Sequence, residues 1–217
     1  MNVLIACEES QRVCTAFREK GHNAYSCDIQ ECSGGHPEWH IQDDVLNVID
    51  GRCLFDTMDG VTHFIETSWD LIVAHPPCTY LSNAGVRWLY NDNGLNLNRY
   101  TLGIQAREFF MRMINADCNK ICVENPIPSK IWLLPPYSQI IQPYMFGHPV
   151  TKKTALWLKG LPELIPTNNV GKPEKETYIT RDGIERTKCW VVDSVRGSKE
   201  RSKTFQGIAA AMAEQWG

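Results

Sequence analysis

The sequence lacks any apolar run approaching the roughly 18 residues that a membrane-spanning helix needs. Its opening stretch, Met1 to Ile5, also lacks the basic flank and the small-residue cleavage site of a secretory signal. We interpret that stretch as the first buried strand of a domain. These absences predict a cytoplasmic protein without a membrane partner.

Two further features are missing: a disulfide framework and an excess of basic charge. The nine cysteines are odd in number and irregularly spaced, and the formal net charge is −3. Only the stretch from 168 to 203 is slightly basic, which fits either a polyanion partner or a solvated polar hairpin. Cys27, Cys32, His36 and His40 stand too close together for the paired ligands of a zinc finger, so we expect no metal.

Short apolar segments alternate with helical ones along most of the chain. Strands are predicted at residues 3–7, 23–27, 69–74, 120–123, 154–158 and 188–192, with a weak one ending near 41. Helices are predicted at 11–20, where Ser10 is a candidate cap, and at 102–116 and 204–216. This alternation is typical of an α/β fold with a mostly parallel, doubly wound, Rossmann-like sheet.

The length of 217 residues fits a single domain. We divide it into a core at 1–160, a small polar appendage at 161–203 and a last segment at 204–217. That last segment is predicted to form a helix that returns to the core.

Polar or reactive residues stand where four predicted strands end: Cys7-Glu8-Glu9-Ser10, Asp28, Cys78 and Glu124. A sheet core does not need such residues there, and ligands of doubly wound sheets bind beyond the carboxyl ends of the strands. This edge of the sheet is therefore the predicted site.

A thiol and a carboxyl group at neighbouring strand ends suit one reaction. Carbon 5 of cytosine attacks a methyl donor only after a thiolate has added to carbon 6 and charge at N3 has been neutralised. Cys78, on a rigid Pro-Pro turn, is the candidate nucleophile. Glu124, kept protonated by burial, is the candidate donor to N3. Taken alone, a cysteine such as Cys78 is more often a buried structural residue.

The segments that carry these residues resemble a known family. Trp-Asp-Leu-Ile-Val-Ala-His-Pro-Pro-Cys at 69–78 is similar to the proline-cysteine motif of DNA cytosine-5 methyltransferases, and Val-Glu-Asn-Pro at 123–126 to their Glu-Asn-Val motif. Nearly the whole chain resembles a short phage and prophage branch of that family. The resemblance implies a class I methyltransferase fold, S-adenosylmethionine as cofactor, DNA as partner, and a phage or prophage protein in a bacterial host.

The resemblance also implies a role for each matching residue. Cys78 would be the nucleophile and Glu124 the partner of N3, with cytosine flipped into the pocket. The cofactor would be held by Ala6, Cys7, Glu8, Ser10, Gln11, Asp28 at the ribose, Asp44 at the adenine amino group, and the main chain at His75 and Pro76. The base and the DNA backbone would be contacted by Asn125, Lys152, Lys153 and Arg87.

The chain departs from the family pattern in three places. The loop after the first strand has no glycine, and Lys152 and Lys153 stand where the family usually has arginines. Only about forty residues separate Leu158 from Arg201, which is little for a target-recognition domain. A separate specificity partner, RNA or a free nucleotide as substrate, and a non-catalytic binding protein that serves as decoy or partner subunit remain alternatives.

Overall fold

A seven-stranded sheet organises the residues that the computed structural model describes, which are 1–92, 94–174, 177–187 and 202–217. Its strands are β1 (Asn2–Ala6), β2 (Asn23–Asp28), β3 (His40–Gln42), β6 (Leu71–Ala74), β9 (Ile121–Pro126), β10 (Gln139–Ile141) and β11 (Thr154–Lys159). In space they lie in the order β10-β11-β9-β6-β1-β2-β3. All the predicted strands up to residue 158 belong to this sheet, and β10 is an addition that the sequence did not indicate.

The sheet is mostly parallel. Strands β1, β2, β3, β6 and β9 all pair in parallel, whereas β11 pairs antiparallel with both β9 and β10. Within the described sheet, β11 is therefore the only strand that runs against the others. The predicted α/β class with a mostly parallel sheet is confirmed.

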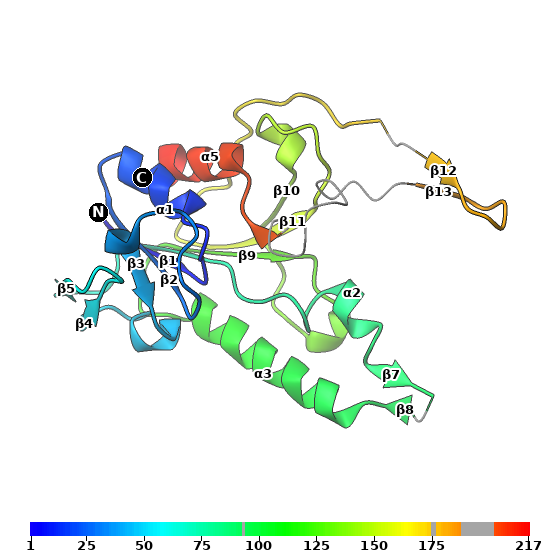
Figure 1. Cartoon of the computed structure of the whole chain (residues 1–217), viewed down its shortest axis with the longest axis horizontal. Coiled ribbons are helices and arrows are strands. Elements are labelled where there is room, and N and C mark those ends of the chain that lie inside the picture. Colours follow the sequence, from blue (N-terminus) through cyan, green and yellow to red (C-terminus); the bar gives the residue numbers. More distant parts are fainter. Residues whose placement is uncertain (93, 175–176, 188–201) are drawn as a thin grey trace.

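Helices cover both faces of the sheet, as Figure 1 shows. The helices of the described residues are α1 (Arg12–Glu19), the short α2 (Asn83–Val86), α3 (Leu97–Ile114) and α5 (Gln206–Trp216). Val3 and Ile5 of β1 pack with Phe17 of α1 and with α5 on one face. Leu4, between them in β1, packs with Phe110 of α3 on the other face. No helix in the described ranges is long and apolar enough to cross a membrane.

Three small hairpins lie outside the main sheet, and the sequence predicted none of them. They are β4 (Cys53–Asp56) with β5 (Thr62–Ile65), β7 (Tyr90–Asn91) with β8 (Gly94–Leu95), and β12 (Thr177–Ile179) with β13 (Glu185–Thr187). The last two extend away from the sheet (Figure 1). The pair β12–β13 falls within the predicted polar appendage, whereas the strand predicted at 188–192 lies outside the described residues.

Gly103 of α3 lies directly against the ring of Trp132. A Cβ atom at Gly103 would lie 1.9 Å from Cη2 of Trp132, whose side chain is buried. We expect Gly103→Ala to lower the free energy of unfolding by about 1–3 kcal/mol, as overpacked core substitutions do. Urea denaturation measures the change. Gln105→Ala, at an exposed position of the same helix, should stay within about 0.5 kcal/mol; equal effects of the two substitutions would contradict the packing of Trp132 on Gly103.

Candidate active site

The carboxyl ends of β2, β1, β6 and β9 meet at one level of the sheet. In the strand register Ala6 lies opposite both Cys27 and Ala74, and Ala74 lies opposite Val123. The next residue along each strand therefore joins a row across four strands: Asp28, Cys7, His75 and Glu124. Every member of this row was a predicted site residue.

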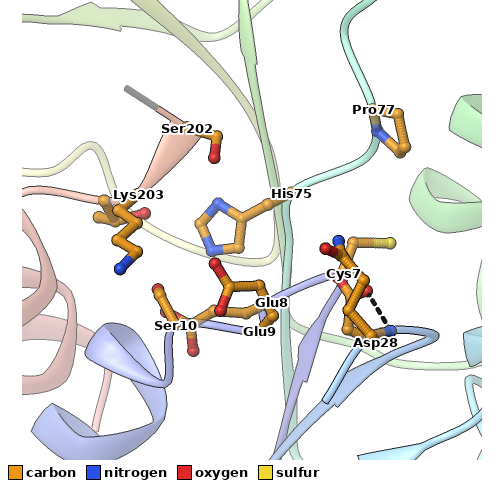
Figure 2. Close-up of a pocket in the computed structure, with 11 residues that line it drawn as sticks. Cys7, Glu8, Glu9, Ser10, Asp28, His75, Pro77, Ser202 and Lys203 are labelled. Carbon is orange, nitrogen blue, oxygen red and sulfur yellow. Dashed lines mark hydrogen bonds between the residues drawn. The ribbon is translucent and has the colours of Figure 1, made fainter. Parts of the chain in front are cut away.

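A cavity of about 400 Å³ opens at this row. Figure 2 shows the His75 imidazole between the loop that follows β1 and the segment that leads into α5. The cavity is lined by Cys7, Glu8, Glu9, Ser10, Asp28, Gln30, His75, Pro77, Ser202, Lys203 and Thr204. Because the last three residues directly precede α5, the chain returns to this edge of the sheet before its final helix.

A second cavity of about 280 Å³ adjoins the first. The two share Cys7, Asp28, Gln30 and Pro77, so Asp28 stands where they meet. The rest of the second lining is Cys27, Ile29, Asp43, Asp44, Val45 and Phe109. Its lining is more apolar than that of the first cavity, with two exposed carboxylates at Asp43 and Asp44.

The loop after β1 makes a tight turn without glycine. Cys7 has φ 60° and Gln11 has φ 57°, both in the left-handed region that favours glycine. Such conformations cost of order 1 kcal/mol or more for a residue with a Cβ atom, so neighbouring contacts must hold them. The backbone therefore turns here as glycines would allow, although the sequence has none.

Glu8 supplies one of those contacts. Its carboxylate accepts hydrogen bonds from the backbone N–H groups of Val13 (2.7 Å) and Cys14 (3.1 Å) at the start of α1. Burial raises the pKa of Glu8, and the charge of His75 and these two hydrogen bonds oppose that rise. The prediction that Ser10 caps this helix is wrong, because Gln11 is the N-cap residue and Glu8 provides the acceptors. Glu8 also lines the first cavity, so its predicted contact with a cofactor stays a prediction.

Gln11 holds the neighbouring loop. Its side chain is fully buried, donates to the carbonyl oxygen of His36 (2.8 Å) and accepts from the His36 backbone N–H (3.0 Å). Neither of the two cavities at the strand ends includes Gln11 in its lining. The predicted cofactor contact of Gln11 therefore does not match its position, because both ends of its amide are occupied inside the fold.

His75 and Glu124 form a buried pair. Nδ1 of His75 lies 3.1 Å from Oε2 of Glu124, and the two side chains are 11% and 14% exposed. Burial lowers the pKa of His75, but the hydrogen bond and the charge of Glu124 raise it more, so the pKa lies above its ordinary value. Nε2 of His75 is buried and has no hydrogen-bond partner among the described residues.

The expectation that burial keeps Glu124 protonated is wrong for the ligand-free protein. Burial does raise the pKa of Glu124, but the hydrogen bond with His75 and the charge of Lys152 lower it more. The net pKa is below the ordinary value for a glutamate. The sequence did not show that the histidine three residues before Cys78 would pair with this carboxylate.

Cys78 is half-buried and lies within electrostatic range of Glu124 and Lys152. Burial raises the pKa of its thiol, the negative charge of Glu124 raises it further, and Lys152 opposes them. The thiol is therefore protonated at neutral pH in the ligand-free protein. The structure brings together Cys78, Glu124 and Lys152, three residues that the sequence placed at the reacting base.

Other predicted residues have different surroundings. Asn125 is buried and donates to the carbonyl oxygen of Pro76 (2.8 Å), which ties the loop before Cys78 to β9. Ala6 accepts from the backbone N–H of His75 (2.9 Å). Lys153 and Arg87 are exposed and line neither cavity at the strand ends, and Arg87 lies 4.8 Å above the ring of Trp88.

Several lining residues were not predicted. Ser202, Lys203 and Thr204 reach the first cavity from the far end of the chain, and Phe109 of α3 reaches the second cavity. Only tertiary contacts bring these residues to the site. Gln30 stands two residues after Asp28, so the rule that ligands bind beyond the strand ends could have identified it.

The cluster weighed as a zinc site has other partners. The His40 ring contacts Ser26 Oγ through Nδ1 (2.8 Å) and the Gln30 carbonyl oxygen through Nε2 (2.9 Å). Cys27 donates to the Asp43 carbonyl oxygen (3.5 Å). Among the residues that the structure describes, no group of three or more His, Cys, Asp or Glu side chains is placed to hold a metal ion.

Comparisons with known proteins add no family to this picture. No family model matches the chain, and no curated protein matches it.

Glu8→Ala tests the structural role of this buried acid. The substitution leaves the Val13 and Cys14 N–H groups without acceptors, so we expect the free energy of unfolding to fall by about 2 kcal/mol. Urea denaturation followed by circular dichroism measures the loss. Glu19→Ala, at the exposed end of the same helix, is the control and should change stability little. A loss no larger than that of the control would refute the capping role.

Proposed function

We propose that this protein transfers a methyl group from S-adenosylmethionine to carbon 5 of cytosine in DNA. The observation that carries the proposal is the placement of Cys78 and Glu124. Cys78 follows β6 by four residues, Glu124 lies in the neighbouring parallel strand β9, and the two interact electrostatically. Neither residue lines the two cavities, but His75, which pairs with Glu124, and Pro77, which precedes Cys78, do. A thiol and a carboxyl group in one place are the groups that this reaction needs, and the charge of Lys152 favours the thiolate form of Cys78.

The order of the strands supports a methyltransferase fold. Counted along the chain within the sheet, the strands lie in the order 3-2-1-4-5-7-6, and the seventh is antiparallel. A dinucleotide-binding sheet has the order 3-2-1-4-5-6. The inserted antiparallel seventh strand is the arrangement expected of class I methyltransferases, the fold that the sequence resemblance implies.

The two cavities suit the two ends of S-adenosylmethionine. The first has a polar lining with Ser10, His75 and Lys203, which fits a charged amino-acid moiety. The second is more apolar, with Val45 and Phe109, which fits an adenine ring. Asp28 stands where the cavities meet, at the end of the second strand, where an acidic residue contacts ribose hydroxyls in related nucleotide sites.

The residues divide the reaction as follows. S-adenosylmethionine supplies an electrophilic methyl group. Cys78 gives its proton to water and adds to carbon 6, and Glu124 donates a proton to N3, so that the electron pair of the C5–C6 double bond becomes available at carbon 5. Carbon 5 then takes the methyl group. Loss of the carbon 5 proton to water, return of the N3 proton to Glu124 and departure of the Cys78 thiolate restore the aromatic ring, and the cofactor would leave as its neutral thioether.

An exposed hairpin supports a polymeric nucleic acid as the substrate. After Cys78 and α2, the chain exposes Arg87, Trp88 and Tyr90, the last two being 59% and 61% exposed. Arg87 is the C-cap residue of α2 and Tyr90 begins β7, and the β7–β8 hairpin extends beyond the sheet (Figure 1). Exposed aromatic rings beside an arginine are suited to stacking on bases, and a free nucleotide would not need them.

One observation supports the non-catalytic alternative. Burial and the charge of Glu124 favour a protonated Cys78, whereas the hydrogen bond with His75 and the charge of Lys152 favour an ionised Glu124, which is the reverse of what the reaction needs. A binding protein with this fold would have no need to reverse them. Measurement of methyl transfer decides between the two.

Labelled S-adenosylmethionine and unmethylated DNA test the proposal directly. We expect 5-methylcytosine in the digested DNA with the natural protein and none with Cys78→Ser, because a hydroxyl group does not replace the thiolate nucleophile. Nucleoside mass spectrometry measures the product. Cys53→Ser, at a half-buried cysteine of the distant β4, is the matched control and should keep the activity.

Parallel reactions with RNA and with free cytidine nucleotides identify the substrate class. Transfer to one of these and not to DNA would correct the substrate and keep the mechanism. If the protein binds S-adenosylmethionine but transfers a methyl group to none of these substrates, the proposed enzyme activity is wrong and the protein is a non-catalytic binding protein.

Asp28→Ala tests the assignment of the cofactor cavities. Loss of a carboxylate that accepts from the ribose hydroxyls should weaken S-adenosylmethionine binding about tenfold or more. Titration calorimetry measures the affinity. Asp56→Ala, on β4, should bind the cofactor as the natural protein does. Equal affinities of all three proteins would show that the cofactor lies elsewhere.

A further inference from the structure

The proposed reaction leaves the source of one proton unexplained. Glu124 must carry a proton to neutralise N3, yet its hydrogen bond with His75 and the charge of Lys152 hold it ionised before the substrate arrives. The hydrogen bond that ionises Glu124 also points to the missing donor. Nδ1 of His75 is 3.1 Å from Oε2 of Glu124, which is within the distance for direct proton transfer.

The surroundings of His75 favour a protonated ring. Glu124 approaches it from β9 and Glu8 from the loop after β1, and both negative charges raise the pKa of His75, whereas Lys152, just before β11, lowers it. The same cavity is lined by Glu9, Asp28 and Lys203. The carboxylates in direct electrostatic contact outweigh the single lysine, and the ring remains basic although it is buried.

We propose that His75 stores the proton that Glu124 delivers to N3, so that the two side chains hold one proton between them. The inference rests on the proposed function. It assigns His75 as a positioning residue and proton store that acts through Glu124. The sequence resemblance implied a role only for the main chain of His75, as a contact of the cofactor.

The proton transfer balances as follows. The Nδ1–H bond of the imidazolium breaks and an O–H bond forms on Glu124, which leaves a neutral imidazole and a neutral carboxylic acid. The acid gives this proton to N3 while the Cys78 sulfur bonds to carbon 6. When the thiolate leaves, the proton returns from N3 to Glu124 and then to Nδ1. A substrate that excludes water favours the first step, because that step removes two buried charges.

Nuclear magnetic resonance of the ligand-free protein tests the shared proton without any substrate. We expect the imidazole nitrogens of His75 to titrate above pH 6.5 in the natural protein. In Glu124→Gln the pKa of His75 should fall by about one unit or more, because the variant lacks the negative charge that opposes the effect of burial. The pKa of His22, at the opposite end of β2, should be the same in both proteins. An unshifted His75 would overturn the proposal.

His75→Asn tests delivery of the proton. Asparagine can donate a hydrogen bond to Glu124 but cannot carry the proton. The measurement is the rate at which Cys78 forms a covalent adduct with DNA containing 5-fluorocytosine, from which the fluorine cannot leave as a proton does. We expect a loss of about a hundredfold at pH 7.5. The ratio of this rate to that of the natural protein should recover as the pH falls, because Glu124 then takes its own proton from water, whereas the loss of Cys78 thiolate at lower pH affects both proteins alike.

The controls separate the possible failures. His22→Asn should keep the rate and the pH profile of the natural protein. A uniform loss at every pH in His75→Asn would give His75 a purely structural role and overturn the proposal. If the natural protein forms no adduct at all, the cytosine chemistry fails, whereas the shared proton is still decided by the titration of His75.

Discussion

The parallel register of β2, β1, β6 and β9 is the constraint on which the rest of the site depends. Because Ala6, Cys27, Ala74 and Val123 lie at one level, the four residues that follow them form a single row. Antiparallel pairing of any of these strands would send its polar end to the opposite edge of the sheet. The two cavities, the His75–Glu124 pair and the position of Cys78 all follow from this alignment.

Burial of charged groups in this row has a cost that specific contacts offset. Glu8 and Glu124 are both largely withdrawn from water, yet they carry out different tasks because their partners differ. Two backbone N–H groups hold Glu8 at the start of α1, whereas His75 holds Glu124. The first arrangement is a fixed part of the fold. The second can exchange a proton, which is the property that the proposed chemistry uses.

The loop after β1 shows how a turn that usually needs glycine is made without it. Cys7 and Gln11 adopt left-handed conformations, and the hydrogen bonds of Glu8 and Gln11 hold the turn on both sides. The acidic Glu8 in this loop thus has a structural role at the start of α1. A loop held in this way has its shape before any ligand arrives.

The sequence by itself determined the sheet, the order of its parallel strands along the chain and the residues at the strand ends. Apolar periodicity and strand-end chemistry are local patterns, and they were sufficient to single out Asp28, Cys78 and Glu124. Only the tertiary structure decided the partner of each group. His75 meets Glu124 across 49 positions of sequence, and residues 202–204 reach the cavity from the end of the chain. The protonation of Glu124 depends on those partners, so no local pattern could have predicted it.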